Sequence, residues 1–209
     1  MTASAKEAAD DVLARARSLL DCESHLPPSV PQSVPADLLR MSLAMGMAAL
    51  DTYFHWKVRQ VDLASPLPKA LHKLEVPFGD LVDSSKVTVQ ARRSGKADRP
   101  IVRARNVLNQ AVLGMTFQTS RGVETAMSLM GKRNYWQPVA AAMPGAPSVE
   151  SLKTDLNRLA NERNKIVHEG DLRRLLRPQR VTHQDRDVAD IRRDLDWIEN
   201  LVCAFDGVI

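Results

Sequence analysis

Apolar side chains recur every three to four residues over most of the chain, a spacing that places them on one face of an α-helix. The most hydrophobic of the predicted helices begins at Pro35 and reaches about residue 60. It is apolar on most of its circumference, which is typical of a central helix or of a helix at a subunit interface. The predicted helices cover residues 5–21, 35–60, 101–118, 122–130 and 149–169, and a last helix starts at Thr182 and Asp185, which have capping-box spacing. The pattern therefore predicts an all-α bundle of long helices.

Two other stretches complete this picture. Residues 61–99 contain several prolines and are expected to form short helices. In the last helix the apolar positions alternate spacings of three and four, which favours packing along another helix. These positions are Val188, Ile191, Leu195, Ile198, Val202 and Phe205.

Composition supports one globular unit. The 209 residues are 44% hydrophobic and 26% charged, so a single domain covering residues 1–209 is expected. Cys22 and Cys203 show neither disulfide nor metal-ligand spacing, which favours a reducing cytoplasm and no metal or other cofactor. The most apolar run, residues 41–50, is about half the length of a membrane span. The net charge of +4 is compatible with an RNA partner without requiring one.

The helix at 149–169 carries an arginine where a leucine is expected. Its apolar stripe through Leu156 and Leu159 continues, after four and three more residues, to Arg163 and Ile166. A buried guanidinium must meet a carboxylate or face a wet, anion-binding cavity, because an unpaired buried charge costs several kcal/mol. A second line of polar residues runs beside this stripe: Asn157, Asn161, Asn164 and His168.

Arg163 and His168 together suit metal-free RNA cleavage, in which a ribose 2′-hydroxyl attacks the neighbouring phosphate. An imidazole can transfer a proton near pH 7, and a guanidinium can stabilise the charge on the phosphoryl transition state. The five-residue separation corresponds to about 140° around the helix and about 7.5 Å along it, so the two side chains would flank a groove. One histidine supplies half of an acid–base pair, and a second copy of the helix across a two-fold axis would supply the other half.

The segment "RNKIVH" (163–168) resembles the R-x4-6-H signature of the HEPN superfamily, and "AALDTYFH" (48–55) looks like the second helix of its RiboL-PSP-HEPN group. The resemblance implies a HEPN-like homodimeric helical bundle. It also implies a metal-independent endoribonuclease of toxin or antiphage-defence type, with RNA as substrate and a possible antitoxin or defence partner protein. In that alignment Arg163 and His168 are catalytic and Asn164 supports them. Gly170 stands where members controlled by tyrosine modification have a tyrosine, so the resemblance does not extend to that regulation.

The same residues allow structural interpretations. Arg163 could pair with Glu162, Asp155 or a carboxylate of another helix, while His168 stabilises the C-terminus of its helix. The alternative function is a catalytically inactive HEPN module that binds RNA, a nucleotide or a protein. Asp51 could support the site by neutralising Arg163, or lie at a solvent-facing turn.

Other polar residues also have two interpretations. For Glu162 a pair with Arg158 or Lys165 is favoured over a chemical role, and for His55 a packed, hydrogen-bonded histidine is favoured over a second catalyst. The other histidines, His25, His72 and His183, are expected on the surface or in loops. The basic runs at residues 92–105 and 173–180 could guide phosphates or be ordinary Arg-rich surface. In the second run the candidate RNA contacts are Arg173, Arg174 and Arg177.

Overall fold

The computed structural model describes residues 3–31, 33–64, 66–95, 100–173 and 182–209. It is all-α, as the spacing predicts: the described residues contain eight α-helices and one short 3-10 helix, and no β-pairing beyond an isolated bridge between Leu172 and His183. The helices are α1 (Ala5–Glu23), α2 (Ser33–Arg59), η1 (Leu71–Lys73), α3 (Phe78–Arg93), α4 (Pro100–Leu113), α5 (Ser120–Leu129), α6 (Trp136–Ala142), α7 (Val149–Glu169) and α8 (Val188–Val208).

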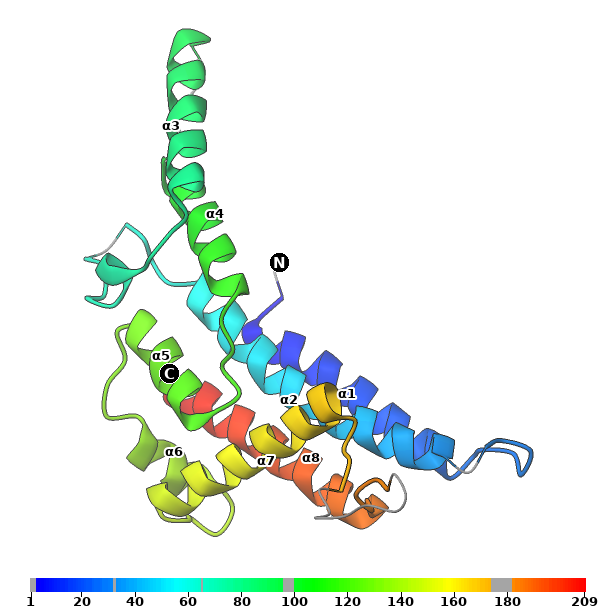
Figure 1. Ribbon diagram of the computed structural model, residues 1–209. Coiled ribbons are helices and arrows are strands. Elements are labelled where there is room, and N and C mark those ends of the chain that lie inside the picture. The colour runs from blue at the N-terminus through cyan, green and yellow to red at the C-terminus, as the bar shows by residue number, and fades with distance from the viewer. Residues whose placement is uncertain (1–2, 32, 65, 96–99, 174–181) are drawn as a thin grey trace.

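Helices α1, α2 and α8 form the centre of the molecule (Figure 1). Small side chains let α1 and α2 approach closely, and the buried Ser42 hydroxyl donates a hydrogen bond to the carbonyl oxygen of Ala16 (2.8 Å). The predicted apolar seam of α8 is confirmed, since Ile191, Leu195 and Phe205 are buried. α2 is therefore the central helix that its nearly all-round hydrophobicity predicts.

Helix α7 packs against α2, with α5 and α6 beside it (Figure 1). The predicted bounds of α7 are confirmed. The Ser148 hydroxyl caps its first turn by accepting from the backbone N–H of Ser151 (3.1 Å), and Gly170 ends it with φ of 64°, a left-handed conformation that glycine adopts freely. The end of α7 that carries the R-x4-H pattern is thus fixed by local sequence.

Three predicted details are wrong or incomplete. The helix expected at 101–118 ends at Leu113, because the next residues turn and hydrogen-bond to side chains of α2. The last helix begins at Val188 and not at Thr182, since Asp187 caps it by accepting from the N–H groups of Ala189 and Asp190. Helix α6 was not predicted, because its seven residues are too few for a clear periodicity.

Helices α3 and α4 form an arm that extends away from the central helices (Figure 1). α4 reaches the body where Leu108 and Val112 are buried, and it contacts α2. No residue of α3 is buried among those whose side chains are described. Where short helices were expected, the described part of residues 61–99 therefore contains one short helix, η1, and one helix of about four turns, α3.

Gly122 lies so close to the turn before α5 that a larger residue should disturb it. A Cβ at this position would be 2.6 Å from the carbonyl oxygen of Thr116 and 2.9 Å from the Cα of Phe117, both backbone atoms. We expect Gly122→Ala to lower the free energy of unfolding by about 1–3 kcal/mol in urea titrations, because the turn must shift. Gly207→Ala is the control: a Cβ there meets nothing within 4 Å, so loss of stability in both variants alike would contradict the steric explanation.

Candidate functional site

Arg163 lies on the inner side of α7 near its C-terminal end, in line with the buried Leu156 and Leu159. It is partly buried, and its Nη1 donates a hydrogen bond to Oδ1 of Asn164 (3.1 Å). Among the described residues no carboxylate forms an ion pair with Arg163: not Glu162, not Asp155, and not a carboxylate of another helix, the three alternatives that the sequence allows. The guanidinium therefore keeps hydrogen-bonding capacity for an anion.

His168 is exposed in the last turn of α7. It lies on the polar line with Asn161 and Asn164, which are exposed as well. Asn157, the first residue of that line, has a structural role: it exchanges hydrogen bonds with Ser120, accepting from its backbone N–H (2.9 Å) and donating to its hydroxyl (3.0 Å). Asn157 is exposed too, but its hydrogen bonds tie it to the start of α5, and the rest of the line lies in the C-terminal half of the helix.

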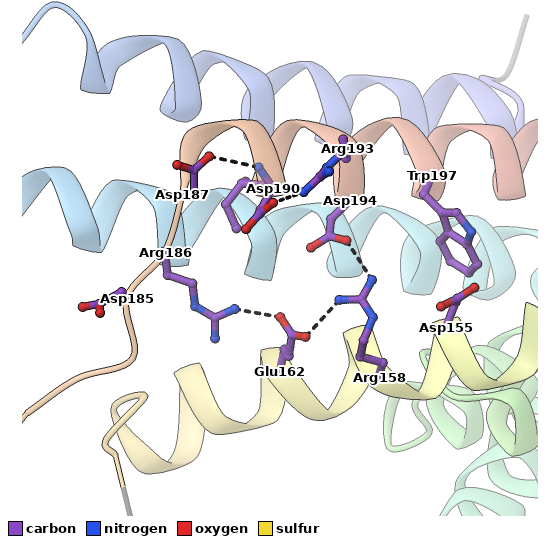
Figure 2. A pocket seen from close by; sticks show the side chains of 11 residues that line it. Asp155, Arg158, Glu162, Asp185, Arg186, Asp187, Asp190, Arg193, Asp194 and Trp197 are labelled. Carbon is purple, nitrogen blue, oxygen red and sulfur yellow. Dashed lines mark hydrogen bonds and ion pairs between the residues drawn. The ribbon is translucent and has the colours of Figure 1, made fainter.

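The other side of α7, toward α8, carries a chain of ion pairs (Figure 2). Arg158 donates to Glu162 (2.9 Å), which confirms one of the two expected pairs, and also to Asp194 on α8 (2.9 Å). Arg186 donates to the second carboxylate oxygen of Glu162 (2.7 Å). Because Glu162 is held by two arginines, it is not free to neutralise Arg163.

The pairs continue into the interior at Asp171, which is fully buried just after α7. Its carboxylate accepts from Arg186 (2.8 and 3.0 Å) and from Nε of Arg40 on α2 (3.1 Å). Burial opposes the charged form of Asp171, but the two guanidinium groups outweigh it and hold its pKa below the usual value. Arg40 also donates to the carbonyl oxygen of Gln184 (2.9 Å).

This network, Arg40–Asp171–Arg186–Glu162, fixes the end of α7 against α2 and against the chain that leads into α8. The sequence reasoning missed it. One signal was available, because Arg40 borders the apolar run of α2 and a charge in such a helix needs a buried partner. The partner could not be named from spacing, since 131 residues separate Arg40 from Asp171.

Asp51 holds the turn before α5. Its Oδ1 accepts from the backbone N–H of Phe117 (2.6 Å), and its other oxygen is 3.8 Å from Nε2 of His55. It forms no ion pair with Arg163 in the part of the chain that the structure describes, so the contact expected for a supporting role is not made within this subunit. His55 is packed and hydrogen-bonded as expected: it lies against the ring of Phe117 and bonds the carbonyl oxygen of Met115 (3.2 Å).

The basic segment after α7 is described only at its start. Arg173 is exposed and pairs with the exposed Asp185, while Arg174 and Arg177 lie outside the described residues. His183, an exposed histidine as expected, bonds the carbonyl oxygen of Gly170 through Nδ1 (2.7 Å). His25 and His72 are exposed as well.

The described ranges contain no group of three or more His, Cys, Asp or Glu residues arranged to hold a metal ion. Over the same ranges no helix combines the length and apolar character that crossing a membrane requires. Comparison of the chain with family models, with curated proteins and with solved structures finds no significant match.

Proposed function

We propose that this protein is a metal-independent endoribonuclease of the HEPN type, with a composite active site formed by the C-terminal ends of two α7 helices in a homodimer. The observation that carries the proposal is the position of Arg163, which has no carboxylate partner among the described residues, five residues before the solvent-exposed His168 at the end of an anchored helix. The Arg40–Asp171–Arg186–Glu162 network supports the proposal, because it commits four buried or partly buried charges to fixing that end of α7.

In this proposal the imidazole of one His168 removes the proton of a ribose 2′-hydroxyl, whose oxygen attacks the adjacent phosphorus. Arg163 donates hydrogen bonds to the phosphoryl oxygens as negative charge grows on them. His168 of the partner subunit protonates the departing 5′-oxygen. The products are an RNA end with a 2′,3′-cyclic phosphate and one with a free 5′-hydroxyl.

Asn164 has a defined part in this scheme. Its side-chain oxygen accepts from Arg163, so it holds the guanidinium between the apolar stripe and the polar line that ends at His168. Arg173, Arg174 and Arg177 follow α7 in the chain and would add positive charge for the RNA backbone.

The test is cleavage of a single-stranded RNA in EDTA by the wild type and by His168→Ala. We expect the wild type to produce 2′,3′-cyclic phosphate ends, a substrate with 2′-deoxyribose at the cut to resist, and His168→Ala to be inactive. His72→Ala is the matched control, because His72 is also exposed but lies far along the chain, in η1. Activity that survives in His168→Ala would sink the proposal.

A catalytically inactive HEPN module is the second candidate. Two apolar side chains at and after the end of α7 are exposed, Val167 and Leu172. Such a surface favours contact with another chain, and it would serve a scaffold protein and an enzyme equally. RNA that binds the wild type without being cut, with or without added divalent ions, would favour this candidate.

A further inference from the structure

Residues 171–173 and 182–184 form a short antiparallel pair just beyond the end of α7, with Leu172 and His183 directly opposite each other. Two backbone hydrogen bonds (2.8 Å each) flank this bridge, one on either side, and neither joins the two opposite residues themselves. In a pair of this kind the opposite Cα atoms are about 4.5 Å apart and the side chains are close. The side chains of Leu172 and His183 therefore lie next to each other.

The pair is held on the outside of the molecule by its buried neighbour. Asp171, directly before Leu172, is fully buried and is bound by Arg40 and Arg186. Leu172, in contrast, is 42% exposed, and His183 is exposed as well. Because the ion pairs fix the backbone at Asp171, they also fix the outward position of the two residues that follow from it, Leu172 and its partner His183.

The imidazole ring of His183 is fixed at the end of α7. Its Nδ1 lies 2.7 Å from the carbonyl oxygen of Gly170, the residue that ends the helix. A carbonyl oxygen can only accept, so Nδ1 carries the hydrogen and donates it. A ring that is already held in place loses little conformational entropy when a ligand packs on it. We call the side chains of Leu172 and His183 together the 172/183 platform.

The 172/183 platform lies immediately beyond the candidate catalytic end of α7. His168 is two residues before Gly170 in the chain, which corresponds to about 3 Å along the helix axis. An RNA strand with its cleaved phosphate at His168 would therefore carry a neighbouring nucleotide past the platform.

The charge at this helix end favours a base over a phosphate as the group that contacts the platform. The last carbonyl groups of a helix carry partial negative charge, which repels a phosphate but not an uncharged base. Unpaired RNA bases stack on aromatic side chains, and histidine is one of these. The exposed Leu172 beside the ring extends the apolar surface on which a base can pack.

We propose that Leu172 and His183 form a nucleobase subsite, on which the base next to the cleaved phosphate stacks. This inference rests on the proposed ribonuclease function, since it takes single-stranded RNA as the ligand. It gives His183 a part in binding and in positioning the strand, separate from the proton transfers assigned to His168.

The test uses a variant that removes the ring and keeps its hydrogen bond. In His183→Asn the amide nitrogen takes the place of Nδ1 and can still donate to Gly170. His25→Asn is the matched control, because His25 is also exposed and its Nδ1 bonds the carbonyl oxygen of Asp21 (2.8 Å), just after α1. The probe is a short, fluorescently labelled single-stranded RNA with 2′-O-methyl groups, which block cleavage. One base is removed at each position in turn.

Binding is measured by fluorescence anisotropy. We expect removal of the base at one position to weaken binding to the wild type about fivefold or more, the lower end of the range for base stacking. His183→Asn should weaken binding of the intact strand by a similar factor and should be insensitive to removal of that base, so the double-mutant cycle isolates the contact. His25→Asn should behave like the wild type.

Three results would overturn the proposal: effects of His183→Asn and of base removal that multiply at every position, an equal loss in His25→Asn, or a strand that does not bind the wild type. Cleavage is measured separately on an unmodified strand. Cleavage without the coupling overturns the base contact alone. Coupling without cleavage supports the base contact and contradicts the proposed ribonuclease.

Discussion

Asp171→Asn is expected to lower the free energy of unfolding by about 3 kcal/mol, because it leaves two largely buried guanidinium groups without their shared carboxylate. Asparagine keeps the shape of the side chain. It also tolerates the left-handed backbone that Asp171 adopts, with φ of 56°, so the change isolates the charge. Urea titration followed by circular dichroism measures the effect.

Asp37→Asn is the matched control for this prediction. Asp37 also pairs with Arg40 (3.1 Å), but its side chain is 64% exposed, so the loss should stay within about 1 kcal/mol. Comparable losses in the two variants would contradict the assignment of the buried carboxylate as the anchor of the network.

Acid should reduce the difference between the wild type and Asp171→Asn. The pKa of Asp171 is lower in the folded protein than its ordinary value of 3.8, so its charge contributes stability that is fully present above that value. This contribution is lost as the pH falls through the lower pKa of the folded state. The stability difference is therefore expected to be constant near neutral pH and to shrink below pH 3.8.

Arg163→Ala and His168→Ala subunits, each inactive alone, are expected to regain part of the wild-type cleavage rate when they are mixed. The loss in each pure variant should be about 10²–10³-fold or more, the range for removing a proton-transfer group or a transition-state hydrogen-bond donor. A mixed dimer keeps one His168 on one subunit and one Arg163 on the other, so one of the two proton transfers of the proposed mechanism lacks its histidine and the recovery is only partial. Recovery requires that the two residues act across the interface.

The measurement is the initial rate at a fixed total protein concentration after the subunits have exchanged. Arg158→Ala mixed with His168→Ala serves as a comparison, because Arg158 is committed to Glu162 and Asp194 and is not expected to contact RNA. A mixture of Arg163 and His168 variants that is no faster than the two separate samples would contradict a site at which one His168 and one Arg163 on different subunits suffice for cleavage.

The sequence predicts the long helices well wherever an apolar stripe and a cap agree. In α7 the stripe, the Ser148 cap and Gly170 all give the same bounds, and the structure adopts them. The sequence fails where a tertiary contact overrides the pattern. Asp51 and His55 on α2 bind the backbone at Met115 and Phe117, so α4 ends early even though the apolar spacing continues through Met115.

The candidate site was predictable in part. That Arg163 occupies a position of the apolar stripe follows from helical spacing, and the structure places it there without a carboxylate partner in the described chain. The anchoring of that helix end was not predictable, because Arg40 lies 131 residues before Asp171, and Arg186 reaches the same carboxylate from 15 residues after it. Spacing shows what shares a helix face, but not what a buried charge meets across the fold.

The distance in sequence between Arg40 and its partners has a consequence for synthesis of the chain. α7 with its Arg163 and His168 leaves the ribosome before Asp171, Gln184 and Arg186, the groups that bind Arg40 and each other. Until those residues emerge, Arg40 lacks its interior carboxylate and the end of α7 is not fixed against α2. The end of α7 can therefore be fixed against α2 only after residue 186 has been synthesised.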